Sequence, residues 1–142
     1  MGLRQSRFAI LGLGVVLLLS ACSGSTPTVA FIDPATVEEV SDGVLPQITL
    51  TETAVDRLAI ATDVVQATDE GYVVPSAAVL ITADGSYWVY TNPEPLVYLR
   101  IEIRPVVEAD KQAFFSEGPA AGTQVVVTGV PELYGTETGL GK

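Results

Sequence analysis

Few residues of this chain could carry out chemistry, and their types limit what that chemistry can be. The 142 residues include no histidine, one cysteine (Cys22) and one methionine. Histidine is the commonest general base and zinc ligand, so serine–histidine and cysteine–histidine catalytic arrangements are impossible. Soft-metal sites also lack their usual ligands. We therefore expect no metal, no cofactor and no enzymatic activity.

Three pairs of neighbouring carboxylates remain as candidates: Glu38–Glu39, Asp69–Glu70 and Glu108–Asp110. Two carboxylates can hydrolyse a glycoside, and clustered carboxylates can bind calcium. No calcium-loop pattern surrounds these pairs, however, and each pair falls in an expected turn or in a segment without periodicity. We interpret them as solvated surface charges.

An apolar segment ends just before Cys22. Residues 1–7 carry two arginines and no acid, and residues 8–19, FAILGLGVVLLL, are uncharged. A serine and an alanine then precede the cysteine. A basic start, an apolar middle and a small-residue end are the three parts of a secretory signal. The apolar segment has about 12 residues, whereas a membrane-spanning helix needs roughly 20.

The sequence Leu19-Ser20-Ala21-Cys22 resembles the lipobox of bacterial lipoproteins. In that family the cysteine is acylated, with chains such as palmitate, and becomes the first residue of the mature protein. The resemblance implies a lipoprotein signal peptide over residues 1–21. It also implies that acylated Cys22 holds the chain on the extracytoplasmic face of a bacterial membrane, in the cell envelope. The alternative is an unpaired thiol in an ordinary signal or anchor.

The charge of the chain limits its partners. The sequence has 17 acidic and 7 basic residues, a formal net charge of −10. Removal of residues 1–21 takes away two basic residues and no acid, so five bases against 17 acids leave a charge of −12. Such a surface repels phosphates and anionic lipid head groups. We therefore expect no nucleic-acid partner, and membrane attachment that depends on the lipid.

Two segments with different patterns follow the signal. Residues 22–46 are rich in Ser, Thr, Pro, Gly and acids and lack a sustained period, which predicts a lipid-anchored flexible tether. An alternative is that VAFI, residues 29–32, forms a strand. Residues 47–142 carry the periodic patterns and are long enough for one modest core. We interpret them as the folded domain.

The domain is expected to be mainly β, a small antiparallel β-barrel or sandwich-like fold with one short helix. QITL, residues 47–50, reads as a strand, and Thr49-Leu50-Thr51-Glu52 has the spacing of a helix capping box. Either threonine could cap a helix of about two turns over ETAVDRLA. Asp84-Gly85 predicts a hairpin between strands in SAAVLIT and SYWVYT. QAFF and QVVVTG supply two more strands.

The segment LVYLRIEIR, residues 96–104, alternates between apolar and polar residues. Alternation predicts a strand with one buried and one wet face. The apolar set, expected to be buried, is Val97, Leu99, Ile101 and Ile103, and the set expected to face solvent is Tyr98, Arg100, Glu102 and Arg104.

Aromatic residues near this strand are the candidates for contact with a partner. Trp88 and Tyr90 share one face of their strand, and Tyr98 follows after a stiff loop that contains Asn92, Pro93 and Pro95. Trp and Tyr are enriched at protein interfaces. The alternative is that Trp88 belongs to the core.

Three stretches of the domain resemble the membrane-proximal domain of periplasmic adaptor subunits, or membrane fusion proteins, of resistance-nodulation-division efflux pumps. They are ITLTETAVDRLAIATDVV, VPSAAVLITADGSYWVYTNPEPLVYLRIEI and EGPAAGTQVVVTGVPELYGTE, which together cover about residues 46–137. In the first stretch Ala59 stands where adaptors usually have glycine. The other two resemble the adaptor hairpin with its WVY strand and the closing valine-rich strand.

The resemblance implies an accessory subunit rather than a complete adaptor. Adaptors place a lipoyl-like domain, an α-helical hairpin and a β-barrel between the first two stretches, whereas only QATDEGYV lies there in this chain. We therefore expect a lipid-anchored binding domain that docks on a membrane transporter and associates weakly with itself. The alternative is a stand-alone envelope lipoprotein that binds another protein or a small ligand.

Overall fold

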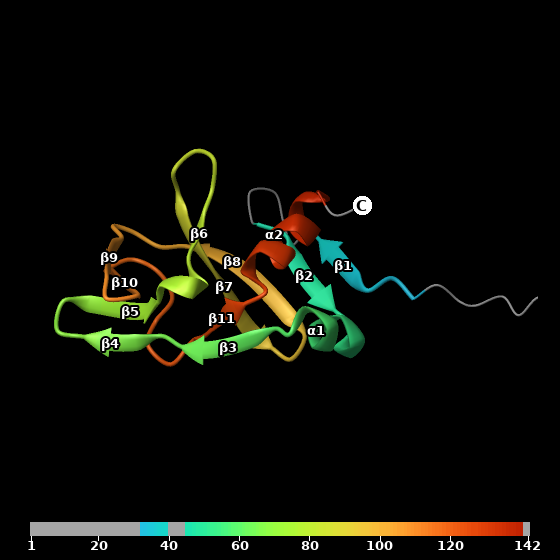
Figure 1. Cartoon of the computed structure of the whole chain (residues 1–142), viewed down its shortest axis with the longest axis horizontal. Helices are drawn as coiled ribbons and strands as arrows, with labels where there is room; N and C mark the ends of the chain where they lie inside the picture. The colour runs from blue at the N-terminus through green and yellow to red at the C-terminus, as the bar shows by residue number, and fades with distance from the viewer. Residues whose placement is uncertain (1–31, 40–44, 141–142) are drawn as a thin grey trace, which may run out of the picture. The chain divides into compact units, whose positions relative to one another are not determined.

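The computed structural model of the chain describes residues 32–39 and 45–140 (Figure 1). Among these residues, no helix is both long enough and apolar enough to cross a membrane. The apolar segment 8–19 and Cys22 lie outside the described residues.

The elements are β1 (Ala35–Glu38), β2 (Gln47–Leu50), α1 (Glu52–Leu58), β3 (Ala61–Val64), β4 (Gln66–Thr68), β5 (Gly71–Pro75), the 3₁₀ turn η1 (Ser76–Ala78), β6 (Leu80–Ile81), β7 (Tyr87–Glu94), β8 (Val97–Glu102), β9 (Val107–Ala109), β10 (Gln112–Phe115), β11 (Gln124–Thr128) and α2 (Val130–Thr138).

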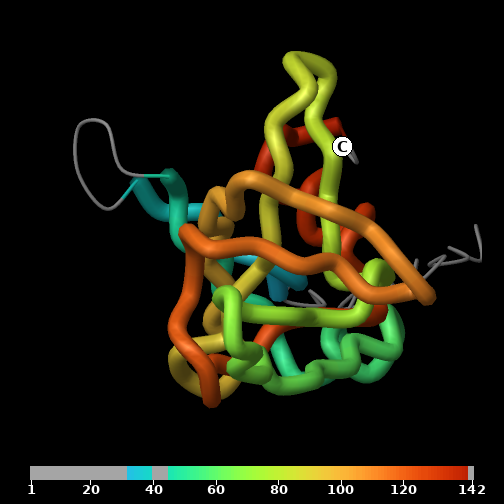
Figure 2. The backbone as a smooth tube through the Cα atoms, turned by 90° about the vertical axis from the view of Figure 1, so that its left-hand side faces the viewer, coloured from blue at the N-terminus to red at the C-terminus, as the bar shows by residue number. Residues whose placement is uncertain are grey.

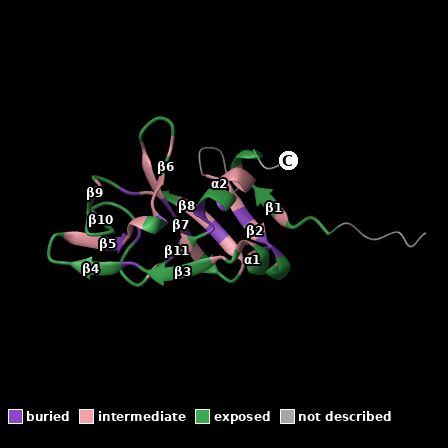
Figure 3. Ribbon diagram, viewed as in Figure 1, coloured by how far each residue is buried: buried purple, intermediate pink, exposed green. Residues whose placement is uncertain are grey.

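The strands form two antiparallel sheets, which confirms the expectation of a mainly β, sandwich-like domain. The larger sheet has the order β1-β2-β8-β7-β11-β3, with β6 paired to β7, and the smaller has the order β4-β5-β10-β9. The sheets are not closed into a barrel. The edge strands β3, β4 and β9 are exposed along their whole length (Figure 3).

Two apolar clusters hold the sheets and helices together. The first, on the helix side of the larger sheet, includes Ile48, Tyr90 and Tyr98 together with Leu133 of α2. The second includes residues from both sheets, which are Val65, Val74, Ala78, Val89, Ile103, Ala113, Phe115 and Val125. The central strands β7 and β11 therefore contribute buried side chains on both of their faces.

The first helix begins and ends where the sequence pattern indicates. The Thr51 hydroxyl accepts a hydrogen bond from the backbone N–H of Ala54 at 3.2 Å, so Thr51 rather than Thr49 is the N-cap. This bond satisfies one of the free amides of the first turn. The helix ends at Ala59, whose φ of 49° lies in the left-handed region that usually favours glycine.

The Asp84-Gly85 hairpin is confirmed, and it projects away from the sheets (Figure 2). Gly85 supplies the positive φ of 84° that the turn requires. Three hydrogen bonds from Thr82 and Ser86 reach the Asp84 carboxylate, and the one from the Thr82 hydroxyl is the main cause of a lowered pKa of Asp84. The strand expected in SAAVLIT is shorter, however, because Ser76–Ala78 form a 3₁₀ turn and only Leu80–Ile81 pair with β7.

The prediction for the two faces of residues 96–104 is confirmed at one end, where Ile103 is buried and Arg104 is exposed. It was wrong for three residues of β8. Tyr98 is buried and Arg100 is largely buried, although both belong to the set expected to face solvent, whereas Ile101 is exposed. The cause is α2, which packs its Leu133 and Val130 against this face. No helix was expected over Val130–Thr138, so the covering element was missing from the prediction.

The N-terminal segment also differs from its expected form. Residues 35–38 form β1, which pairs antiparallel with β2 from Ala35↔Leu50 to Glu38↔Gln47. The expectation of an unstructured tether over residues 22–46 is therefore wrong for these four residues. Strand β1 is short and mostly exposed, so it is held in place mainly by its hydrogen bonds to the edge of β2. The VAFI alternative concerns residues 29–31, which lie outside the described part, and Ile32, which is not in a strand.

Candidate functional site

A buried ion pair joins the second helix to the larger sheet. Arg100 of β8 and Glu137 of α2 approach to 2.7 Å between Nη2 and Oε1, and their side chains are only 11% and 4% exposed. The second carboxylate oxygen of Glu137 accepts a hydrogen bond from the hydroxyl of Tyr90 on β7. One carboxylate from the C-terminal helix therefore fixes side chains from two neighbouring strands.

Aromatic rings enclose the guanidinium group of this pair. The Cζ of Arg100 lies 4.5 Å from the ring centroid of Trp88 and 5.4 Å from that of Tyr134. Both distances fall within the range of cation–π attraction. Trp88 is held in turn by a 3.0 Å hydrogen bond from its Nε1–H to the Thr82 hydroxyl. The Nε atom of Arg100 is buried and has no partner among the described residues.

The electrostatics of the cluster favour a structural role. Burial raises the pKa of Tyr90 far above its ordinary value, and the hydrogen bond to Glu137 raises it further. The Tyr90 hydroxyl therefore stays protonated and serves as a permanent donor. The carboxylate of Glu137 is held by Arg100 and Tyr90 and is shielded from solvent. This arrangement suits the attachment of α2 better than proton transfer.

Two residues predicted to contact a partner are not on the surface. Tyr90 and Tyr98 are both buried in the first apolar cluster under α2. The prediction of a partner contact is therefore wrong for them, because the strand faces were assigned without that helix. Trp88, which is half-buried, lies between the hairpin and Arg100 and belongs to the same network.

The remaining three predicted contacts lie at the β7–β8 turn. The side-chain amide of Asn92 donates to the carbonyls of Glu94 at 2.7 Å and Val97 at 2.8 Å, so Asn92 shapes the turn. Pro93 and Pro95 are exposed. Together with the loop before β11, these residues line a shallow hollow of about 530 Å³; its lining is Asn92, Pro93, Glu94, Pro95, Gly122, Thr123 and Gln124.

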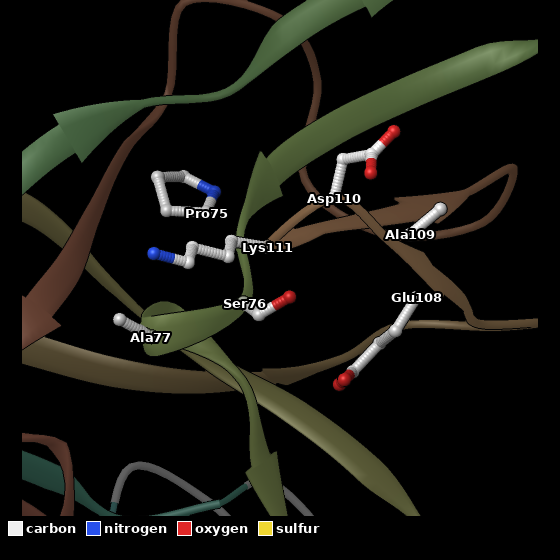
Figure 4. A pocket seen from close by; sticks show the side chains of 7 residues that line it. All are labelled: Pro75, Ser76, Ala77, Glu108, Ala109, Asp110 and Lys111. Atoms are coloured by element: carbon white, nitrogen blue, oxygen red, sulfur yellow. The ribbon is translucent and has the colours of Figure 1, made fainter.

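The paired carboxylates considered above are exposed. Asp69 and Glu70 form the β4–β5 turn. Glu108 and Asp110 line an open hollow of about 690 Å³ between η1 and the β9–β10 turn, and the side chain of Lys111 points away from both (Figure 4). Among the described residues, no three acidic side chains come close enough to hold a metal ion.

A third hollow was not anticipated from the sequence. It lies between α1 and the segment that leads into β1, has a volume of about 660 Å³ and is lined mainly by apolar atoms. Leu50 and Ala54 are buried beneath it, Leu58 is half-buried, and Ile32 at its rim is 77% exposed. We call it the α1 groove. The apolar segment around Ile32 was a signal for it, but the groove exists only because β1 pairs with β2.

Comparisons with protein-family models, with curated proteins and with solved structures find no match for this chain. The resemblance to efflux adaptors and the lipobox at Cys22 therefore stay predictions from the sequence.

Proposed function

We propose that the protein is a lipid-anchored binding domain on the extracytoplasmic face of a bacterial membrane. The observation that carries the proposal is the order of segments before Cys22: two arginines, an apolar stretch, two small residues and then the only cysteine. This order resembles a lipoprotein signal. With a mature charge of −12, electrostatic attraction gives no other route to an anionic membrane surface.

A binding role fits the chemistry of the described surface better than catalysis does. The buried carboxylate Glu137 is engaged by Arg100 and Tyr90, and the paired acids are exposed on the surface. The proline-containing β7–β8 turn, by contrast, has a fixed shape and exposed apolar rings. The resemblance to adaptors makes the extracytoplasmic face of a transporter the partner that we propose for this turn.

The anchoring is tested by changing the cysteine and its position. Cys22→Ser should move the protein from the membrane fraction to the soluble fraction of disrupted cells. The matched control is Cys22→Ser with Ser25→Cys, which restores a thiol three residues away from the lipobox position and should also stay soluble. Retention of Cys22→Ser in membranes, with normal removal of the signal, would contradict the lipoprotein assignment.

The partner contact is tested by photo-crosslinking from single positions. A photoreactive residue at Pro93 should give an adduct with a polytopic membrane protein. The same residue at Asp84, at the exposed tip of the other projecting hairpin, is the control and should not. Equal adducts from both positions, or none from Pro93, would contradict the proposed contact at the β7–β8 turn.

A further inference from the structure

The α1 groove combines an apolar floor with one exposed large apolar side chain, Ile32, at its rim. Ile32 is among the most exposed large apolar residues of the described chain, and the groove beside it is lined by Leu50, Ala54 and Leu58. An exposed apolar side chain beside an apolar hollow makes this area a candidate for contact with another apolar surface.

The charges along the groove set it apart from the rest of the surface. Only two charged residues line it, and they have opposite signs: Glu52 and Arg57. The mature chain as a whole carries a charge of −12. The lining of the groove is therefore neutral overall on a strongly acidic protein, although the exposed carboxylates of Asp33 and Asp56 adjoin it.

The length of chain between the anchor and the groove is short. Ile32 is ten residues after Cys22, and a chain of that length spans at most about 36 Å even when fully extended. The described domain begins at Ile32, at the rim of the groove itself. An acylated Cys22 therefore limits how far the groove can lie from the bilayer. It sets a looser limit on surfaces that are formed by residues farther along the chain.

We infer that the α1 groove faces the membrane and that its rim, with Ile32 and Arg57, rests in the lipid interface. The occupant is the bilayer surface to which Cys22 is attached, so the inference rests on the proposed lipid anchoring. Apolar contact supplies the attraction, and Arg57 can pair with lipid phosphates. The smaller sheet, at the opposite end of the domain from β1 and α1 in Figure 1, then points away from the membrane.

The test measures how fast single cysteines react with a charged maleimide in water. Ile32→Cys and Thr53→Cys place reporters on the groove, and Val107→Cys places a control on β9, where Val107 is 63% exposed. Each variant is prepared as the full lipidated protein in phosphatidylcholine vesicles and as a soluble form that also carries Cys22→Ser. The lipid occupies the Cys22 thiol in the first form, so each preparation has one reactive cysteine.

We expect the two groove cysteines to react about tenfold more slowly in vesicles than in the soluble form, the factor that corresponds to burial of one medium-sized apolar side chain. Val107→Cys should react equally fast in both. Equal rates for the groove cysteines in the two forms would overturn the inference while the anchoring stood. Slow reaction in the soluble form as well would mean that protein covers the groove, and would also overturn it.

Failure of the proposed anchoring has a different signature. The protein would then not remain with the vesicles, and Cys22 itself would react with the maleimide in the otherwise unaltered chain. The inference would fall with the anchoring in that case, and the labelled Cys22 would identify the cause.

Discussion

Arg100 joins three elements of the domain through its charged group. It lies on β8, pairs with Glu137 of α2 and is stacked between Trp88 of β7 and Tyr134 of α2. A charge buried to this extent costs free energy unless it is paired. The stability of the contact between helix and sheet should therefore depend on its carboxylate partner.

Glu137→Gln should lower the free energy of unfolding by about 3 kcal/mol, because it leaves the buried guanidinium of Arg100 without a compensating charge. The matched control is Glu117→Gln. Glu117 pairs with Arg104 at the same distance of 2.7 Å, but both side chains are 64% exposed, so its loss should leave the urea midpoint unchanged. Equal losses for the two variants would contradict a special role of the buried pair.

The buried tyrosines predict how stability depends on pH. Burial raises the pKa of Tyr90 and of Tyr98 above the ordinary value of 10.0, and the Glu137 carboxylate raises that of Tyr90 further. Both stay neutral in the folded chain while the unfolded chain ionises. Their contribution is therefore fully present below the unfolded pKa and is lost as pH rises above it.

We expect the free energy of unfolding to fall above about pH 10 by up to about 1.4 kcal/mol per pH unit for each buried tyrosine. Urea unfolding at about pH 8 to 11 measures this slope. Tyr90→Phe should make the slope shallower, since phenylalanine cannot ionise. A slope that Tyr90→Phe leaves unchanged would show that Tyr90 ionises equally in both states.

At the scale of elements, turn and cap residues were the most reliable guides. Thr51 and the Asp84-Gly85 turn act through local geometry, so four or five residues contain the whole signal.

The second helix, Val130–Thr138, has no side chain that caps its start and contains Gly135, so its sequence favours a helix only weakly. It is stabilised by burial of Leu133 and by the Glu137 pair, which are long-range contacts.

Because α2 was not predicted from the sequence, the residues beneath it were assigned to the wrong face at the candidate site. Strand alternation identifies two faces but does not say which of them a later element will cover. Without α2, Tyr90 and Tyr98 were placed on the surface and Arg100 in solvent. The exposed β7–β8 turn with Pro93 and Pro95 could be predicted because it depends on the local sequence alone. The α1 groove could not, because it requires the pairing of β1 with β2.

A glycine at the start of β5 provides a prediction at this scale. A Cβ atom on Gly71 would lie 2.4 Å from the backbone carbonyl oxygen of Phe115, which cannot move without disturbing β10. Gly71→Ala should therefore destabilise the domain by about 3 kcal/mol more than Gly122→Ala does. Gly122 also has a positive φ, but a Cβ there meets nothing within 4 Å. Equal thermal midpoints for the two variants would contradict the close approach.

At the scale of the whole molecule, β1 moves the start of the described domain to within a few residues of Ile32. β1 adds to the larger sheet beside β2, and Ala35 packs against the first apolar cluster. The folded part therefore begins nearer to Cys22 than the composition of residues 22–46 suggested. Under the proposed acylation of Cys22, a shorter connection would restrict how far the domain can move from the membrane.

The contribution of β1 can be measured by truncation. A chain of residues 32–142 should be more stable than a chain of residues 47–142 by about 2 kcal/mol, because the shorter chain loses the hydrogen bonds between β1 and β2 at about 0.5–1 kcal/mol each. Both chains should fold, since the two clusters consist almost entirely of later residues. Identical urea midpoints would show that β1 adds no stability.

The most direct test of the whole account is the mass of the protein extracted from membranes of the cells that make it. We predict a chain that begins at Cys22, with added mass equal to a glyceride and fatty acyl groups, and acyl groups that mild alkali removes in part. A chain that still begins at Met1, or one that starts at Cys22 with a free thiol and no added mass, would contradict the lipid anchor and with it the proposed orientation of the domain on the membrane.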